Sequence, residues 1–61
     1  MIKLKIARIE KGLKQKEVAE KAGITYEYLS ALENGRMKNP SKKIMDKISI
    51  VLGKSVNELF Y

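Results

Sequence analysis

The fold of this chain is decided by residues 12–36, which read GLKQKEVAEKAGITYEYLSALENGR. The apolar residues recur with the spacing of one helix face and do not alternate as they would along a strand. We therefore expect one helix over residues 15–21 and a second over residues 26–34, joined by the short segment 22–25. Two helices joined so closely have the geometry of a helix-turn-helix. An ordinary helical hairpin inside a bundle would show the same periodicity, so periodicity alone does not separate the two.

The segment between the two helices has the composition of a tight turn. Gly23 tolerates a positive φ, which suits a residue that ends a helix, and Ile24 supplies an apolar side chain that can pack between the two helices. Thr25 is a favourable N-cap for the second helix, whereas Lys14, at the same position before the first helix, is a poor one. The residues expected to face the core are Val18, Ala19 and Ala22 in the first helix and Leu29 and Leu32 in the second.

Outside this stretch, the spacing of apolar residues predicts three more helices, over residues 3–11, 42–52 and 56–60. A serine stands at the cap position before each of the last two, and the last one also has the spacing of a capping box. The residues expected to face inward are Leu4, Ala7 and Arg8, then Met45, Ile48 and Leu52, then Val56, Leu59 and Phe60. The prediction is an all-α, compact five-helix fold in which residues 1–61 form a single domain.

The composition argues against an enzyme. The chain has 61 residues, near the lower size limit for a domain that folds alone, and it contains no cysteine and no histidine. Disulfides, zinc sites of the usual kind and a histidine general base are therefore excluded. Four glutamates, Glu17, Glu20, Glu27 and Glu33, lie at helical intervals that point them in different directions rather than into a catalytic pair. We predict no catalytic activity, no metal and no cofactor.

The sequence also lacks the marks of a membrane or secreted protein. No apolar run approaches the roughly 18 residues needed to span a bilayer. The first residues, MIKLKIAR, carry a charge at every second or third position, unlike the apolar region of a signal peptide. We expect a cytoplasmic protein with no membrane contact and no small-molecule ligand.

The charge balance favours a polyanionic partner. Thirteen Lys and Arg stand against seven Asp and Glu, which gives a formal net charge of +6. Such an excess attracts nucleic acid, although many small soluble domains are basic without binding it. The local distribution says more, because residues 36–43 carry four positive charges and no negative one.

The solvent side of the helix predicted over residues 26–34 is small and polar. On a helical wheel this side lies opposite Leu29. Its residues are Glu27, Ser30, Ala31 and Asn34, with Tyr26 and Tyr28 at its borders. Such a face can approach base edges: a glutamate accepts a hydrogen bond from cytosine N4, an alanine touches a thymine methyl, and a serine pairs with several edges. The alternative is a solvated surface with no ligand.

Positive charge flanks this side of the helix instead of lying on it. Lys14 and Gln15 open the preceding helix, and Arg36 and Lys38 follow the second one. This is the division expected of a DNA-binding domain, in which phosphate contacts position the protein and base contacts specify the sequence. The free N–H groups at the start of the preceding helix would also favour a phosphate. Tyr28, at the border, is assigned to the same phosphate-contacting set.

At this point the sequence resembles a known family. Residues 12–36, the segment Asn39-Pro40-Ser41 and residues 52–60 look like the helix-turn-helix domain of the phage-repressor/Cro (Xre-type) family. The resemblance covers essentially the whole chain at fixed spacing. It implies a lambda-repressor-like fold and sequence-specific binding of double-stranded DNA by a bacterial or phage transcriptional regulator, most often a repressor, with the second of the two helices in the major groove.

The resemblance also implies roles for individual residues. It places Tyr26, Glu27 and Ala31 at base-reading positions, to which the wheel adds Ser30. It assigns Gln15, Asn34, Arg36 and Lys38 to contacts with the DNA backbone, and Arg8 and Glu33 to a structural ion pair between two helices. Some phage repressors carry glutamines where this chain has tyrosine and glutamate at the start of the reading helix, so their operators do not transfer.

A single reading helix covers only a few base pairs, and members of this family commonly dimerise on two half-sites. We expect a homodimer formed through residues 56–60 and the end of the helix over 42–52. Surplus apolar residues are available for it: Ile6, Ile9, Ile50 and Tyr61. Scattered exposed apolar residues are, however, normal in monomers. The alternative function is an antitoxin or anti-repressor that uses the same fold to bind a protein.

Overall fold

The computed structural model describes all 61 residues and contains five helices and no strand. The helices are α1 (Ile2–Glu10), α2 (Gln15–Ala22), α3 (Tyr26–Glu33), α4 (Lys42–Leu52) and α5 (Val56–Phe60). The predicted all-α class, the number of helices and their order are confirmed. The observed ends of α1, α2 and α3 differ from the predicted ones by a single residue, which is the usual uncertainty at frayed helix ends.

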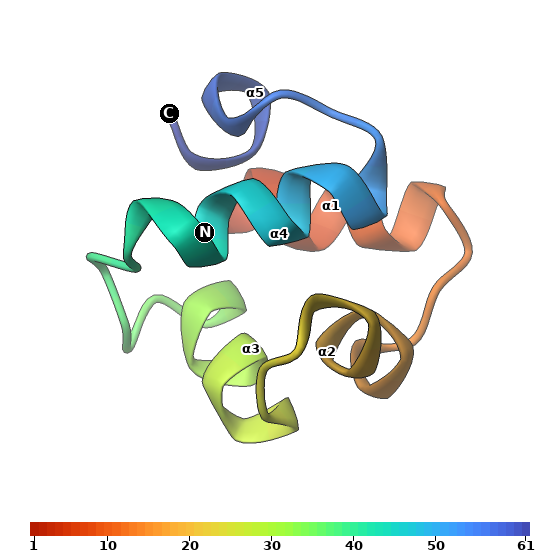
Figure 1. Cartoon of the computed structure of the whole chain (residues 1–61), viewed down its shortest axis with the longest axis horizontal. Coiled ribbons are helices and arrows are strands. Elements are labelled where there is room, and N and C mark those ends of the chain that lie inside the picture. The colour runs from red at the N-terminus through yellow and green to blue at the C-terminus, as the bar shows by residue number, and fades with distance from the viewer.

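The helices pack around one core (Figure 1). In this view α4 crosses the middle in front of α1, with α5 on one side of the pair and α2 and α3 on the other. Helix α2 packs against α3 and α4, and α1 packs against α3 and α5. The molecule measures 24 × 22 × 19 Å along its principal axes. None of the five helices is both long and apolar enough to cross a membrane.

The core consists of ten buried apolar residues contributed by all five helices. They are Leu4, Ala7, Val18, Ala19, Ala22, Leu29, Leu32, Ile48, Leu52 and Leu59. Every one of them lies on a face that the sequence predicted to point inward. Such agreement is expected, because the helical period of the apolar residues fixes which side of each helix can be buried.

Besides Arg8, three apolar residues predicted to face inward are only half-buried: Met45, Val56 and Phe60. For Met45 the prediction is wrong, because α4 turns Ile44, Ile48 and Val51 toward the core and leaves Met45 in the groove against α5. Helix α5 has only five residues and buries Leu59 alone, while Phe60 packs against the edge of the core. Val56 lines the same groove as Met45, so that prediction is also wrong.

The helix ends explain how α2 and α3 are set at an angle to each other. Gly23 ends α2 with φ 69°, and Thr25 begins α3 by accepting a hydrogen bond at its side-chain oxygen from the N–H of Tyr28 at 3.0 Å.

No side-chain oxygen caps the start of α2, since the Lys14 side chain has no acceptor. Glu17 instead accepts a hydrogen bond from the backbone N–H of Lys14 at 2.9 Å. The N–H groups of the first turn of α2 therefore remain available to an external acceptor.

Candidate nucleic-acid interface

The reading face, defined as Tyr26, Glu27, Ser30 and Ala31, lies on the solvent side of α3. Tyr26 and Glu27 are exposed, and Ser30 and Ala31 are half-buried. The opposite side of the helix carries the buried residues Leu29, Leu32 and Glu33. The face is thus positioned by an apolar stripe that anchors α3 to the core and by a cap that fixes where the helix starts.

The residues predicted to contact phosphate fall into two groups. Lys14, Asn34, Arg36 and Lys38 are exposed, whereas Gln15 and Tyr28 are half-buried. Tyr28 packs against the core, so its ring also has a structural role. The three cations among these residues are free of ion pairs, because the two ion pairs of the structure join other residues. Free, exposed cations are the groups that neutralise phosphates.

A hydrogen bond links the reading face to the end of α3. The side-chain amide of Asn34 donates to the hydroxyl of Ser30 at 3.3 Å, across one turn of the helix. Sequence reasoning placed both residues on one side of the helix but did not pair them. The spacing of four residues was the available signal, because residues four apart are neighbours on a helix surface.

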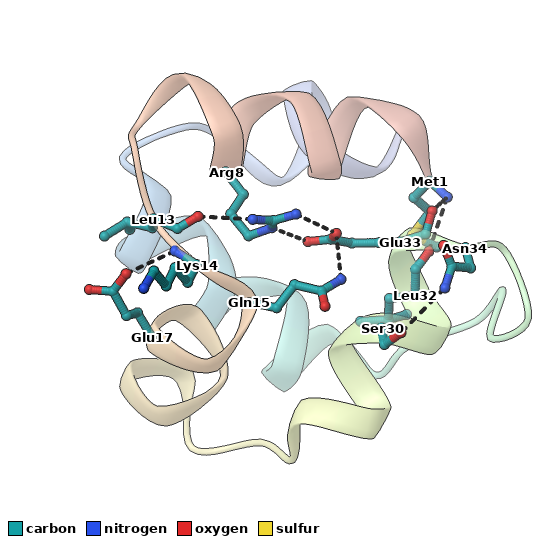
Figure 2. A network of polar contacts seen from close by, with 10 residues as sticks. All are labelled: Met1, Arg8, Leu13, Lys14, Gln15, Glu17, Ser30, Leu32, Glu33 and Asn34. Atoms are coloured by element: carbon teal, nitrogen blue, oxygen red, sulfur yellow. Dashed lines mark hydrogen bonds and ion pairs between the residues drawn. The ribbon is translucent and has the colours of Figure 1, made fainter.

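Beneath the surface, Glu33 forms a bidentate ion pair with Arg8 (Figure 2). The Nε of Arg8 donates to Oε2 at 2.6 Å and its Nη2 donates to Oε1 at 3.0 Å. The Glu33 side chain is fully buried and that of Arg8 is 12% exposed. The Nη1 of Arg8 also donates to the carbonyl of Leu13 at 2.9 Å, so one guanidinium connects α1, the α1–α2 loop and α3.

Gln15 completes this network, a role that no pattern in the sequence indicates. Its Nε2 donates to Oε1 of Glu33 at 2.9 Å, which ties the first residue of α2 to the last residue of α3 (Figure 2). The two residues are 18 positions apart on different helices, so only the angle between the helices brings them together. The predicted phosphate ligand is therefore already engaged by a buried carboxylate.

The start of α1 also supports the C-terminal end of α3. The α-ammonium group of Met1 donates to the carbonyl oxygens of Leu32 and Glu33 at 3.0 and 3.2 Å. A positive charge at the last carbonyls of a helix is favourable, because the helix dipole is negative there. No pattern in the sequence predicts this contact.

Two helices joined by a tight glycine turn, with a small polar outer face on the second and free cations around it, define a helix-turn-helix domain. The chain belongs to the helix-turn-helix family, whose sequence profile matches residues 4–59. The resemblance to the Xre-type family drawn from residues 12–36 is thereby confirmed.

Individual relatives agree with this assignment. The chain is 44% identical to the HTH-type transcriptional regulator SinR of Bacillus subtilis over 57 residues, which is 93% of this chain and 51% of SinR. It is 43% identical to the ImmF control region 10 kDa protein of Bacillus phage phi105, over 92% of this chain and 61% of that protein.

A solved structure shows the same fold. The N-terminal DNA-binding domain of SinR superposes with a TM-score of 0.88 at 43% identity, over 95% of this chain and 84% of that domain. The predicted lambda-repressor-like helical fold is therefore confirmed as the fold of a known DNA-binding domain. The chain spans about half the length of SinR itself.

Proposed function

We propose that this chain is a sequence-specific, double-stranded DNA-binding transcriptional regulator that acts as a repressor. One observation carries the proposal: the reading face of α3 is small, polar and solvent-facing, while the free cations Lys14, Arg36 and Lys38 stand around it. Two relatives support it by name, one a transcriptional regulator and the other a phage control-region protein.

In this proposal α3 lies in the major groove. Glu27 accepts a hydrogen bond from cytosine N4, Ala31 touches a thymine methyl, and Ser30 pairs with an adjacent base edge. Lys14, Arg36 and other exposed cations neutralise phosphates and fix the register of the helix on the duplex. Regulation then follows from occupancy of a promoter in the cytoplasm, with no chemical step, cofactor or small-molecule ligand.

The proposal includes a homodimer, whose two protomers meet through α5 and the end of α4. Each protomer would then bind one of two half-sites. Its support is exposure: Ile50 on α4 is 81% exposed and Tyr61, next to α5, is 73% exposed. Replacing Ile50 with glutamate should lower self-association in sedimentation experiments, because a buried charge would be introduced at the contact. An unchanged association constant would show that Ile50, and with it the end of α4, does not lie in the interface.

The alternative is a protein-binding role of the antitoxin or anti-repressor kind. One observation favours it: the solved structure of the SinR protein in complex with the SinI protein has the same fold, at a TM-score of 0.88. The salt dependence of binding separates the two roles. If about five phosphates are neutralised, log affinity for DNA should fall with log salt at a slope of about −4 to −5. A protein partner would give a weaker slope.

The direct test is selection from a random duplex library. The wild-type chain should enrich a defined sequence, and Glu27→Gln should change the preferred base at one position while keeping most of the affinity. Glu10→Gln, which alters an exposed glutamate on α1, is the matched control and should enrich the wild-type sequence. The absence of enrichment by the wild-type chain would overturn the proposed function.

A further inference from the structure

The Arg8–Glu33 ion pair contacts Gln15 at the start of α2, and this contact defines how Gln15 presents its amide. A carboxylate only accepts hydrogen bonds, so the Nε2 of Gln15, 2.9 Å from Oε1 of Glu33, must be the end that faces it. A flipped amide would set two oxygens against each other. The amide is therefore held in one orientation, with one N–H directed at Glu33 and the other N–H free.

Glu33 itself is fixed before any ligand arrives. Its carboxylate receives two hydrogen bonds from Arg8 and one from Gln15, and its side chain is fully buried. Arg8 is held in turn by the carbonyl of Leu13. Each group in this chain of contacts is held by at least one hydrogen bond, so the position of the Gln15 amide follows from the fold.

The same ion pair compensates the negative charge of Glu33. A buried carboxylate lying one hydrogen bond beneath a phosphate-binding surface would repel the phosphate. Arg8 compensates the Glu33 carboxylate at 2.6 Å, so a phosphate beside Gln15 would meet no unpaired negative charge. Lys14, exposed next to Gln15, then supplies the net attraction.

We propose that Arg8 and Glu33 are positioning residues for DNA binding: they hold the amide of Gln15 so that its free N–H donates to a backbone phosphate oxygen. This inference rests on the proposed function. A side chain fixed on folding loses no rotational freedom on binding, so the contact contributes its full strength. With the ion pair removed, Gln15 rotates freely and most of the benefit is lost.

A double-mutant cycle tests this coupling. Arg8→Met together with Glu33→Leu removes the ion pair without changing net charge, and apolar replacements of buried ion pairs commonly preserve the fold. Gln15→Ala should weaken binding to the selected duplex about fivefold in the wild-type background, the size of one hydrogen bond. In the background that lacks the ion pair, Gln15→Ala should have almost no further effect. Neither change should alter the salt slope, because no cation that meets phosphate is lost.

The control is a second charge-neutral removal of an ion pair. Lys42 and Asp46 form an exposed pair on α4, and Lys42→Gln with Asp46→Asn should leave the Gln15→Ala effect at about fivefold. The positioning role is overturned if Gln15→Ala costs the same factor with and without the Arg8–Glu33 pair, since the pair would then be structural only.

A second measurement does not depend on the variants folding. In wild-type protein, the two side-chain amide protons of Gln15 should exchange with water at different rates in NMR experiments, with the one facing Glu33 protected. Adding duplex should shift the other. Equal and unprotected exchange of the two protons would overturn the inference, whereas a protein that binds no duplex while showing a protected proton would overturn the proposed function alone.

Discussion

At the residue scale, Glu33 decides how three helices meet. Its buried carboxylate collects hydrogen bonds from Arg8 on α1 and Gln15 on α2, and no buried side-chain polar atom in the structure lacks a partner. The family resemblance paired Glu33 with Arg8, whereas its burial on the inner side of α3 is seen only in the structure. The role of Gln15 could not be predicted, because it depends on the angle between α2 and α3 rather than on any periodicity.

Removing one partner of this pair should be severe. Arg8→Ala or Glu33→Ala leaves a charge buried without its partner, which costs about 3–5 kcal/mol of unfolding free energy. That loss is comparable to the stability of a core this small, so thermal melts followed by circular dichroism should show a largely unfolded chain. Lys42→Ala, at the exposed pair, should cost about 1 kcal/mol or less. Equal losses at the two sites would contradict the account.

The exposed cations around the reading face should act on all DNA sequences alike. Replacing Arg36 or Lys38 with glutamine removes one phosphate contact, so the magnitude of the salt slope should fall by about 0.9 for each change. Fluorescence anisotropy at several salt concentrations measures it, with selected and scrambled duplexes compared. A loss confined to the selected duplex would assign that residue to base reading instead.

At the scale of helices, the ends matter more than the middles. Thr25, Ser41 and Ser55 each cap a helix through the side-chain oxygen, as the sequence indicated. The orientation of α4 was less predictable. Ile44 and Met45 are adjacent and similarly apolar, and only packing against α2 and α5 decides which of them points inward.

Gly23 sets the break between α2 and α3 through its backbone conformation. Its φ of 69° disfavours any residue with a Cβ, and a Cβ built there would meet only the Nζ of Lys47 at 3.9 Å. Gly23→Ala should therefore cost about 1–2 kcal/mol through strain alone, without a clash. Gly23→Asn should cost less, because asparagine tolerates this conformation better. Urea titration measures both, and a larger loss for asparagine would contradict this explanation.

Helix α5 should respond to acid through its cap. The Glu58 carboxylate accepts a hydrogen bond from the backbone N–H of Ser55 at 2.9 Å, which with the Ser55 side chain lowers the pKa of Glu58 below its ordinary value of 4.5. A lowered folded-state pKa stabilises the protein above the ordinary pKa, and the stabilisation is lost as pH falls through the folded value. The melting temperature should therefore drop below about pH 4.5.

The comparison that checks this is Glu58→Gln, which keeps an acceptor oxygen but cannot titrate. Its melting temperature should fall less than that of the wild type as the solution is acidified. Glu10→Gln, which removes an exposed glutamate whose side chain makes no cap hydrogen bond, is the matched control. Identical acid responses of wild type and Glu58→Gln would show that the cap does not contribute.

At the scale of the whole molecule, the ten-residue core holds α3 in place. Leu29 and Leu32 anchor α3 from the inside, which leaves its outer side free for a ligand. The apolar pattern was sufficient to predict this arrangement of α3, since it placed Leu29 and Leu32 on the buried side of that helix. The polar network beneath the surface was not predictable in the same way, because its members come from three helices and meet only in the folded chain.

The central claim is that the reading face of α3 enters duplex DNA, and an NMR titration tests it most directly. Adding the duplex selected from the library should shift backbone amide signals of Tyr26, Glu27, Ser30 and Ala31, together with those of the first turn of α2. Signals from the exposed side of α1 should stay in place. Shifts confined to α4 and α5, with the reading face unchanged at saturating duplex, would contradict the account.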